Sequence, residues 1–293
     1  MGALFAFVKL SRPHFLVGGA LLFGLGSVAA GDISWLDYAL GQAMVTSMQI
    51  TAHFVNEYAD REVDREVERR TMFSGGSGVL VSGDLKPEVA LWAAWASTTI
   101  GVILAGVVGF VSPLAAGVGL ITLAVSWGYS MPPIRLLATG WGELATSLVV
   151  VVAVPTIGWA VQQAPANAAL WWAVGILFPV HMAMMLVFEL PDLETDAAAG
   201  KRVLGVRLGE ARSSRLIAIM LVGAAVIAAI GVAAGGIAAG VGWAVLAGLI
   251  PALILRGAIR NRNHAATTLA AVSTLVVVAG VLLFVVAGSW SGW

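Results

Sequence analysis

The sequence has no cysteine and few charged residues. Lys, Arg, Asp and Glu make up 11% of its 293 residues, whereas hydrophobic residues make up 59%. Without cysteine, the chain forms neither disulfide bonds nor a thiolate metal site. A soluble domain carries roughly a quarter charged residues, so this composition indicates an integral membrane protein. The 16 basic and 16 acidic residues cancel, so net charge points to no class of partner, and we expect no nucleic-acid partner.

A nucleotide-binding P-loop is also missing. The segment 65–88 is rich in glycine and serine but lacks the sequence G-x-x-x-x-G-K-[ST]. Such a segment either wraps a phosphate with its backbone N–H groups or forms a simple cap. We favour the second interpretation, in which the segment forms a cap that covers the functional site and Arg69 or Arg70 reaches inward.

Long apolar runs dominate what is present. A membrane-spanning helix needs about 20 mostly apolar residues, and nine stretches qualify. They are roughly Phe15–Ala30, Trp35–Val55, Val89–Val111, Leu114–Trp127, Leu144–Ala160, Leu170–Phe188, Leu216–Ala234, Gly240–Leu255 and Leu269–Val286. The runs therefore predict an all-α membrane protein of about nine transmembrane helices, with residues 1–293 forming a single domain.

The distribution of basic residues supports this count. If the nine spans alternate in direction, one side of the membrane receives the N-terminus and the segments 56–88, 128–143, 189–215 and 256–268. All 16 Lys and Arg residues fall on that side. Cytoplasmic loops are enriched in Lys and Arg, so we predict that the N-terminus and these segments are cytoplasmic and that the C-terminus lies outside.

An acidic cluster directly follows the second apolar run. If that helix continues past Val55, then Asn56, Asp60 and Asp64 are four residues apart and share one stripe of its surface. Three oxygen ligands on one stripe suit Mg²⁺, which takes carboxylates and substrate phosphates and keeps some water. His53 lies one turn earlier in the apolar part, and we interpret it as a packing or hydrogen-bonding residue.

A second acidic cluster repeats this spacing after the sixth run. Asp192 and Asp196 are again four residues apart, and Lys201 and Arg207 follow them. Carboxylates followed by cations suit a metal-complexed diphosphate, because the carboxylates bind the metal and the cations bind the remaining phosphate oxygens. One D-x-x-x-D motif is weak evidence, but two on the same predicted face are much more specific. The alternative reading is a solvated, charge-balanced rim.

The two clusters together resemble those of the UbiA-type membrane prenyltransferases. The pattern N-x-x-x-D-x-x-x-D at 56–64 is paired in that family with D-x-x-x-D, here at 192–196. The run DLETDAAAGKRVLGVRLG at 192–209 is especially similar to the second motif of the menaquinone-pathway branch, which prenylates dihydroxynaphthoate. The segment YSMPPIR at 129–135 resembles one found in other branches, including chlorophyll synthase. The sequence departs from the family at Glu57, where many members have Asp, and at 73–80, where FSGGSGVL replaces R-P-x-x-S-G.

The resemblance implies nine helices around a central cavity with cytoplasmic cap loops. It also implies a Mg²⁺-dependent transfer of an isoprenyl group from an isoprenyl diphosphate to an aromatic, quinone-precursor type acceptor, with release of diphosphate. The catalytic residues would be Asp60, Asp64, Asp192 and Asp196, and the metal ligands these four with Asn56. The diphosphate would be bound by Lys201, Arg135, Arg65 and Arg207. The aromatic residues Tyr129, Trp127 and Phe188 lie near the expected cavity mouth, where they would shield a carbocation by cation–π contact.

Other functions remain open at this point. The same architecture would suit a non-aromatic lipid or sugar-phosphate acceptor, or a terpene cyclase that cyclises the donor. A secondary transporter would be a different class, but the predicted spans have almost no ionisable residues at mid-depth, where transporters carry them. The expected partners are thus an isoprenyl diphosphate donor, an aromatic acceptor and the lipid bilayer.

Overall fold

The computed structural model describes residues 2–66, 70, 75–165, 168–235, 272–273, 275–276 and 278–280. Within these ranges the chain is helical, and no β-strand occurs. The last two predicted spans, Gly240–Leu255 and Leu269–Val286, lie almost entirely outside the described residues.

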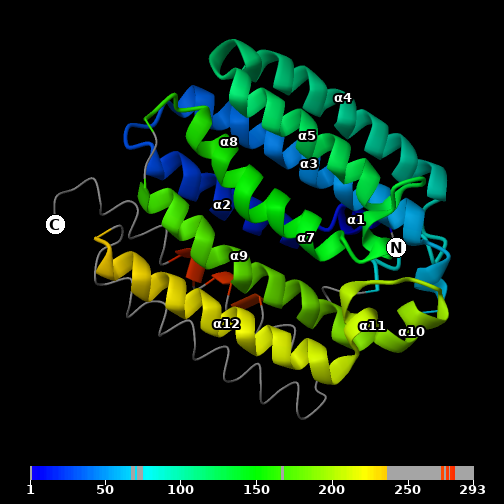
Figure 1. Ribbon diagram of the computed structural model, residues 1–293. Helices are drawn as coiled ribbons and strands as arrows, with labels where there is room; N and C mark the ends of the chain where they lie inside the picture. The colour runs from blue at the N-terminus through cyan, green and yellow to red at the C-terminus, as the bar shows by residue number, and fades with distance from the viewer. Residues whose placement is uncertain are drawn as a thin grey trace.

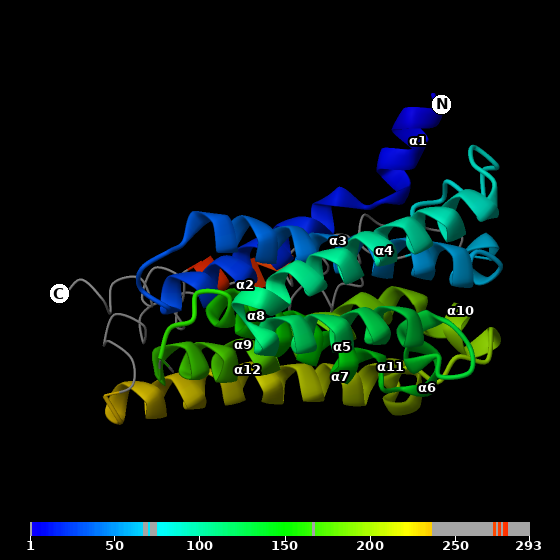
Figure 2. The ribbon, with the colours of Figure 1, turned by 90° about the horizontal axis from the view of Figure 1, so that it is seen from above.

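Long helices lie side by side in one bundle (Figure 1). They are α2 (Leu16–Ala29), α3 (Trp35–Asp60), α4 (Pro87–Val111), α5 (Pro113–Ser130), α7 (Gly142–Ser147) continued by α8 (Val154–Ala160), α9 (Ala168–Glu189) and α12 (Glu210–Ala233). Short helices gather at one end of this bundle, where the N-terminus also lies (Figures 1 and 2). They are α1 (Ala3–Leu10), α6 (Leu136–Thr139), α10 (Leu193–Ala198) and α11 (Leu204–Leu208).

Each of the first seven predicted spans coincides with a described helix. Among the described residues, five helical segments are long and apolar enough to cross a membrane. They are Pro87–Val111, Pro113–Ser130, Gly142–Ala160, Ala168–Ala198 and Glu210–Ala233. The first two predicted spans are not among them. α2 has only 14 residues, and α3 carries polar residues such as Gln42, Gln49 and His53 along its length.

The fifth predicted span is one continuous helical segment with an irregular middle. Residues Leu148–Ala153 form a π-helical stretch between α7 and α8. Pro155 follows in the first turn of α8, where it has no N–H to donate to the preceding turn. Gly26 of α2 and Gly158 of α8 allow these helices to touch, because a Cβ at Gly26 would overlap the Pro155 carbonyl and one at Gly158 the Phe23 carbonyl.

Two hydrophobic clusters hold the bundle together. The larger one joins the long helices through fully buried side chains such as Phe23, Met44 and Leu177. The smaller one lies at the end where the short helices gather. There Leu10 of α1, Phe54 of α3 and Val79 of the loop before α4 pack together. This cluster fixes the N-terminal helix and that loop against the end of α3.

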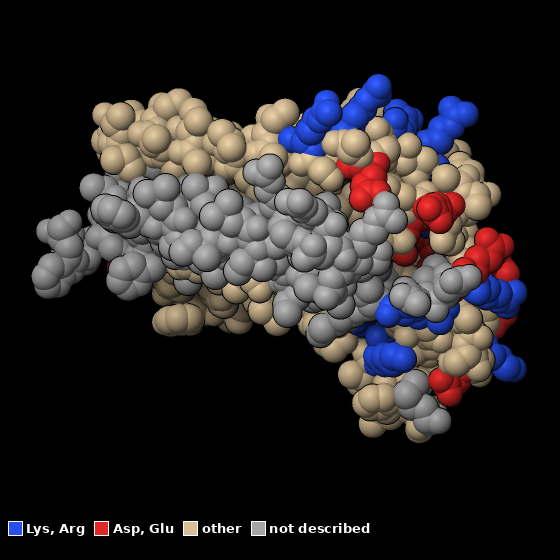
Figure 3. Space-filling model, turned by 90° about the horizontal axis from the view of Figure 1, so that it is seen from below, with Lys and Arg blue, Asp and Glu red and all other residues tan. Residues whose placement is uncertain are grey.

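Charged residues concentrate at this same end of the molecule. Lys, Arg, Asp and Glu side chains gather at one end of the space-filling view, while the described residues toward the other end are mostly uncharged (Figure 3). The apolar bundle and its charged end are the arrangement that a membrane-embedded helical protein requires.

Candidate active site

The first acidic cluster begins on the last turns of α3. The helix continues past Val55, as predicted, but it ends at Asp60. Asp64 follows after a turn, in the 3₁₀ helix η2 (Val63–Arg65). The prediction of a single α-helical stripe through Asn56, Asp60 and Asp64 is therefore wrong beyond Asp60. Asn56 and Asp60 do share a face, because the Asn56 side-chain amide donates a hydrogen bond of 2.8 Å to Asp60 Oδ2.

Lys201 joins the two acidic clusters. Its Nζ atom lies 3.2 Å from Asp196 Oδ1 and 3.8 Å from Asp60 Oδ2. Asp60 and Lys201 are 8% and 9% exposed. Burial acts to lower the pKa of Lys201, but the carboxylates of Asp60 and Asp196 outweigh this effect and raise it. Lys201 is therefore a buried ammonium ion held between carboxylates that are far apart in the sequence.

Asp64 is buried beneath the loop that precedes α4. Gly76 of this loop, with φ +69°, lies so close that a Cβ there would overlap the Asp64 carboxylate. Arg70 donates hydrogen bonds to the backbone carbonyls of Asp64 and Gly75, which fastens the loop to η2. Burial, with the nearby charges of Asp60 and Glu57, raises the pKa of Asp64 to about 7. Of the two arginines expected to reach inward, Arg70 does contact the cluster, and Arg69 lies outside the described residues.

Glu57 ties the same loop to the N-terminal segment. Its carboxylate accepts hydrogen bonds of 2.6 Å from the Ser77 N–H and 2.7 Å from the Ser77 hydroxyl. Arg12, which lies between α1 and α2, places Nε 3.7 Å from Glu57 Oε1. Glu57 is only 3% exposed. Glu57 therefore holds the loop and the N-terminal segment together beside Asn56.

The second cluster lies on short elements that follow α9. Asp192 ends the 3₁₀ helix η4 (Leu190–Asp192) and occupies the N-cap position of α10, one turn before Asp196. The predicted spacing is thus present, but Asp192 and Asp196 do not continue α9. Asp192 is half-buried, and Asp196 forms an ion pair with Lys201.

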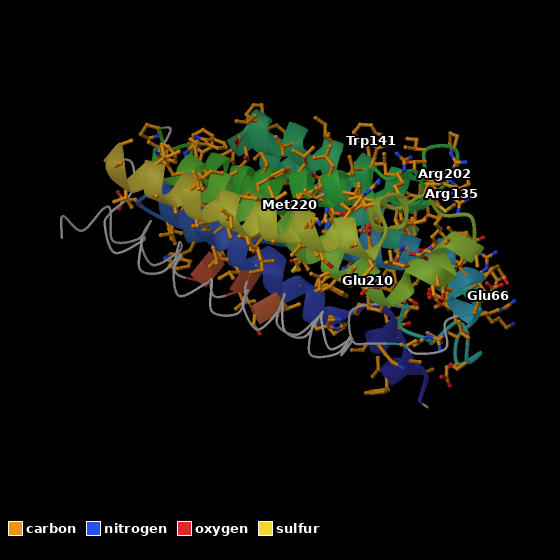
Figure 4. All side chains as sticks on the ribbon, turned by 60° about the horizontal axis from the view of Figure 1, so that its bottom comes forward. Glu66, Arg135, Trp141, Arg202, Glu210 and Met220 are labelled. Carbon is orange, nitrogen blue, oxygen red and sulfur yellow. The ribbon has the colours of Figure 1, made fainter. Side chains whose placement is uncertain are left out.

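The three arginines predicted to bind diphosphate lie at the edge of this region. Arg135 is exposed at the start of α6, and Figure 4 shows it near Arg202. Arg65 is exposed and pairs with Glu62, with Nη1 2.6 Å from Glu62 Oε2. Arg207 donates to the backbone carbonyls of Arg202 and Thr139. Arg207 thus joins two loops, and Arg65 is engaged on the surface.

The three aromatic residues predicted at the cavity mouth differ in their surroundings. Trp127 donates a hydrogen bond of 2.9 Å to Thr98 and stacks on Trp95, with ring centroids 4.4 Å apart, so it faces α4. Phe188 packs against the large hydrophobic cluster. Tyr129 has a hydrogen bond with Thr146 and lies within electrostatic range of Asp60 and Glu143. Of the three, Tyr129 is the one whose contacts place it beside the acidic clusters.

The donor set is suited to a hard divalent cation such as Mg²⁺. Within the described residues, no three His, Cys, Asp or Glu side chains form a ready-made metal cage. Asp60 and Asp196 nevertheless both contact one ammonium group, which shows that a cation fits between them. Mg²⁺ is usually bound through one or two carboxylates, with waters and substrate phosphates as the other ligands. The residues therefore fit an ion that is held jointly with a phosphate group.

Sequence reasoning missed several residues of this region, and one of them had a visible signal. Arg12 and Ser77 meet Glu57 only through folding, so no local pattern marks them. Glu143, by contrast, is the only acidic residue between Glu88 and Glu189. It begins the fifth span and is 1% exposed. A single carboxylate at the start of an apolar run could have indicated a buried side chain that binds another part of the protein.

The fold is thus that of an integral membrane protein whose helical bundle brings two acidic motifs, distant in the sequence, to one buried lysine. Residues 17–277 match the family model described as the UbiA prenyltransferase family. The chain belongs to this family and is a prenyltransferase, so the transporter alternative is dropped.

Two curated relatives of similar identity act on different acceptors. The digeranylgeranylglyceryl phosphate synthase of Thermococcus kodakarensis is 26% identical over 95% of this chain and 97% of its own length. The 1,4-dihydroxy-2-naphthoate octaprenyltransferase of Bacillus subtilis is 26% identical over 72% of this chain and 68% of its own length. The resemblance to the dihydroxynaphthoate branch therefore does not single that branch out.

A solved structure shares the fold. A UbiA homolog from Archaeoglobus fulgidus bound to DMAPP and Mg²⁺ superimposes with a TM-score of 0.66 at 15% identity, over 98% of this chain and 99% of its own. At this identity the likeness concerns the fold alone.

Proposed function

We propose that this protein transfers an isoprenyl group from an isoprenyl diphosphate to an aromatic, quinone-precursor type acceptor and releases diphosphate in a Mg²⁺-dependent reaction. The observation that carries the proposal is the position of Lys201 between Asp60 and Asp196. Two carboxylates and a cation at one buried point suit a metal–diphosphate complex. The related Archaeoglobus protein bound to DMAPP and Mg²⁺ supports this choice of donor and ion.

The residues divide the work of binding the donor. Asp60 and Asp196 would hold Mg²⁺, with Asn56, Asp64 and Asp192 as the nearby oxygen ligands. When bound, the ion withdraws negative charge from the diphosphate and makes it a better leaving group. Lys201 would exchange part of its contact with the carboxylates for diphosphate oxygens, and Arg135 would bind the diphosphate from the rim.

The bond changes follow from this arrangement. The allylic C–O bond breaks, and its electron pair leaves with the diphosphate. A ring carbon of the acceptor bonds to the allylic carbon, and the ring then loses the proton from that position. Tyr129 and Phe188 would border the reacting carbon and shield its positive charge. The apolar isoprenyl tail would lie among the membrane helices.

The cations of the site favour an aromatic acceptor over a phosphate-bearing one. A phosphate monoester adds about two negative charges beside the diphosphate, whereas an aromatic carboxylate adds one. Two arginines that would balance the extra charge are already paired with carboxylates, Arg12 with Glu57 and Arg65 with Glu62. The glyceryl phosphate acceptor is the second candidate, because a relative that matches 95% of this chain is a digeranylgeranylglyceryl phosphate synthase.

The test combines an acceptor panel with isosteric variants. Membranes containing the protein are incubated with Mg²⁺, isoprenyl diphosphates of several lengths, and dihydroxynaphthoate, hydroxybenzoate, homogentisate or glyceryl phosphate. Mass spectrometry identifies the prenylated product, and released diphosphate is measured separately. Asp60→Asn and Asp196→Asn should abolish product formation, whereas Glu194→Gln, an exposed residue of the same motif, should not. Turnover at the wild-type rate in both Asn variants would overturn the proposal.

We further propose that the N-terminus and the charged end of the bundle face the cytoplasm. The concentration of all sixteen Lys and Arg residues in the predicted segments of one side supports this orientation. Labelling of single cysteines introduced into this cysteine-free chain by a membrane-impermeant thiol reagent tests it. A cysteine at exposed position Glu210 should react only after the membrane is opened, and reaction in intact cells would contradict the orientation.

A further inference from the structure

Lys201 reaches its carboxylates from a segment without regular structure. It lies between α10 and α11, in residues 199–203. A lysine side chain has four flexible bonds, so its ammonium group is placed accurately only if its backbone is fixed. The backbone N–H of Lys201 donates 2.9 Å to the Asp196 carbonyl, and that of Arg202 donates 2.9 Å to the Ala138 carbonyl. These bonds fix the segment on its N-terminal side.

Two carboxyl groups, one buried and one half-buried, fix the segment on its other side. Glu143, at the start of α7, accepts a hydrogen bond of 3.0 Å at Oε1 from the Leu204 N–H. Glu189, the last residue of α9, accepts one of 2.6 Å at Oε2 from the Gly205 N–H. Two membrane helices thus hold consecutive N–H groups at the start of α11.

The two carboxyl groups also face each other. Glu143 and Glu189 lie within electrostatic range of one another. Glu143 Oε2 has no hydrogen-bond partner among the described residues, whereas Glu143 Oε1 and Glu189 Oε2 accept from the backbone N–H groups of Leu204 and Gly205. The two carboxyl groups therefore hold adjacent backbone groups of one segment.

Gly205 fits closely against Glu189. A Cβ at position 205 would lie 2.6 Å from Glu189 Oε2 and 2.9 Å from a methyl group of Leu193. Any larger residue would push the backbone away from the carboxyl group. Val203, two residues before it, is buried, and so the chain from Lys201 to Gly205 is held by packing as well as by hydrogen bonds.

We propose that Glu143 and Glu189 are positioning residues that clasp the start of α11 and thereby hold Lys201 in place to bind the diphosphate of the donor. This inference rests on the proposed function, which makes Lys201 a ligand of the diphosphate. Each carboxyl group binds a backbone N–H group at the start of α11. Glu143 and Glu189 therefore affect binding of the donor diphosphate by fixing the position of Lys201.

The test measures binding of geranyl diphosphate with Mg²⁺ to the purified full-length protein in detergent, by isothermal calorimetry. Glu189→Ala should weaken binding about tenfold to a hundredfold, the range expected for loss of one charge-assisted hydrogen bond. Gly205→Ala should weaken it in the same direction without changing either carboxyl group. Glu189→Gln should bind nearly as well as the wild type, because the amide donates to Glu143 and accepts from Gly205. Glu210→Gln, an exposed carboxylate at the start of α12, serves as the matched control (Figure 4).

A double-mutant cycle separates positioning from general destabilisation. If Glu189 acts through Lys201, then adding Glu189→Ala to Lys201→Met should weaken binding no further than Lys201→Met alone. Fully additive losses would overturn the inference, and so would wild-type binding in Glu189→Ala and Gly205→Ala. Loss of binding in Glu189→Gln would also overturn it, because it would mean that the acid itself is needed. Failure of the wild-type protein to bind geranyl diphosphate would instead refute the proposed function.

Discussion

Replacing Lys201 with methionine removes one positive charge while keeping a side chain of similar length. Its Nζ atom lies 3.2 Å from Asp196 and 3.8 Å from Asp60. At an effective dielectric constant of about 20, these distances correspond to gross attractions of about 5 and about 4 kcal/mol. The cost of taking the ammonium group out of water offsets much of this. Removing one partner of a buried ion pair costs about 3–5 kcal/mol, and we expect Lys201→Met to lower the free energy of unfolding by about this amount in the absence of metal.

Mg²⁺ should have the opposite effect on this variant. In the metal-free protein the lysine ammonium occupies the space between the two carboxylates, so it competes with a divalent cation. Without it, Asp60 and Asp196 repel each other and attract Mg²⁺ more strongly. We therefore expect Mg²⁺ alone to bind Lys201→Met more tightly than the wild type. Geranyl diphosphate should bind the variant more weakly, because a phosphate ligand is lost.

Thermal unfolding in detergent measures both effects. The melting temperature is followed without metal, with increasing Mg²⁺, and with Mg²⁺ plus geranyl diphosphate. Lys86→Met is the control, because Lys86 is exposed at the N-cap of α4 and its removal deletes the same charge elsewhere. If Lys201→Met melts at the wild-type temperature without metal, or if Mg²⁺ stabilises both proteins equally, the lysine does not bridge the two motifs and the reasoning fails.

Two further perturbations test the loop above Asp64 and the charge of Asp64 itself. Gly76→Ala and Gly83→Ala share a backbone cost of about 1 kcal/mol, because both glycines have positive φ, but only Gly76 contacts Asp64. Mg²⁺ titrations should therefore show weaker binding in Gly76→Ala alone, and equal affinities would contradict the contact. The pKa of Asp64 is raised to about 7, so the metal-free site is protonated below that pH and must lose this proton to bind Mg²⁺. Mg²⁺ affinity should rise with pH up to about 7 and level off above it, and Asp64→Asn should flatten this rise; a wild-type profile already flat from pH 5 would refute the assignment.

The stability of the metal-free protein should change with pH in the opposite direction to the Mg²⁺ affinity. The folded protein holds the Asp64 proton more tightly than the unfolded chain, because the folded pKa of about 7 exceeds the ordinary aspartate pKa of 3.8. Stability contributed by this group is therefore present below pH 4 and is lost as the pH rises toward 7. If Asp64 is a Mg²⁺ ligand, as proposed, the ion would replace the proton as the charge partner at higher pH. Metal binding and proton release would then be coupled at this carboxyl group.

The helical runs and the two acidic motifs were predictable because each depends on local sequence. Apolar length sets a membrane span, and the described helices follow the first seven predicted runs closely. Lys201 was correctly placed near the acidic residues because it follows Asp196 by only five positions. The end of α3 at Asp60 was not predictable in this way. A four-residue spacing fits a helix, but it also fits the turn and 3₁₀ helix that bring Asp64 under Gly76.

The contacts that sequence reasoning could not find all join distant segments. Glu57 meets Ser77 and Arg12, which lie 20 residues after it and 45 residues before it. The role of Arg207 was predicted from its charge, but its guanidinium is used by backbone carbonyls of two loops. An arginine beside an acidic motif serves equally well as an anion ligand or as a loop brace. Sequence pattern does not distinguish the two, because the choice depends on which carbonyls the fold brings within reach.

The two acidic clusters use their carboxylates for two separate tasks. Asp60 and Asp196 point to the shared lysine, and in each cluster another carboxylate accepts from the backbone of a neighbouring segment. Glu57 holds Ser77 beside the first motif, and Glu189 holds Gly205 beside the second. The segments held in this way carry Gly76 in one case and Lys201 in the other. Replacing either backbone-binding carboxylate with alanine should therefore weaken binding of metal and donor without removing any of the proposed ligands.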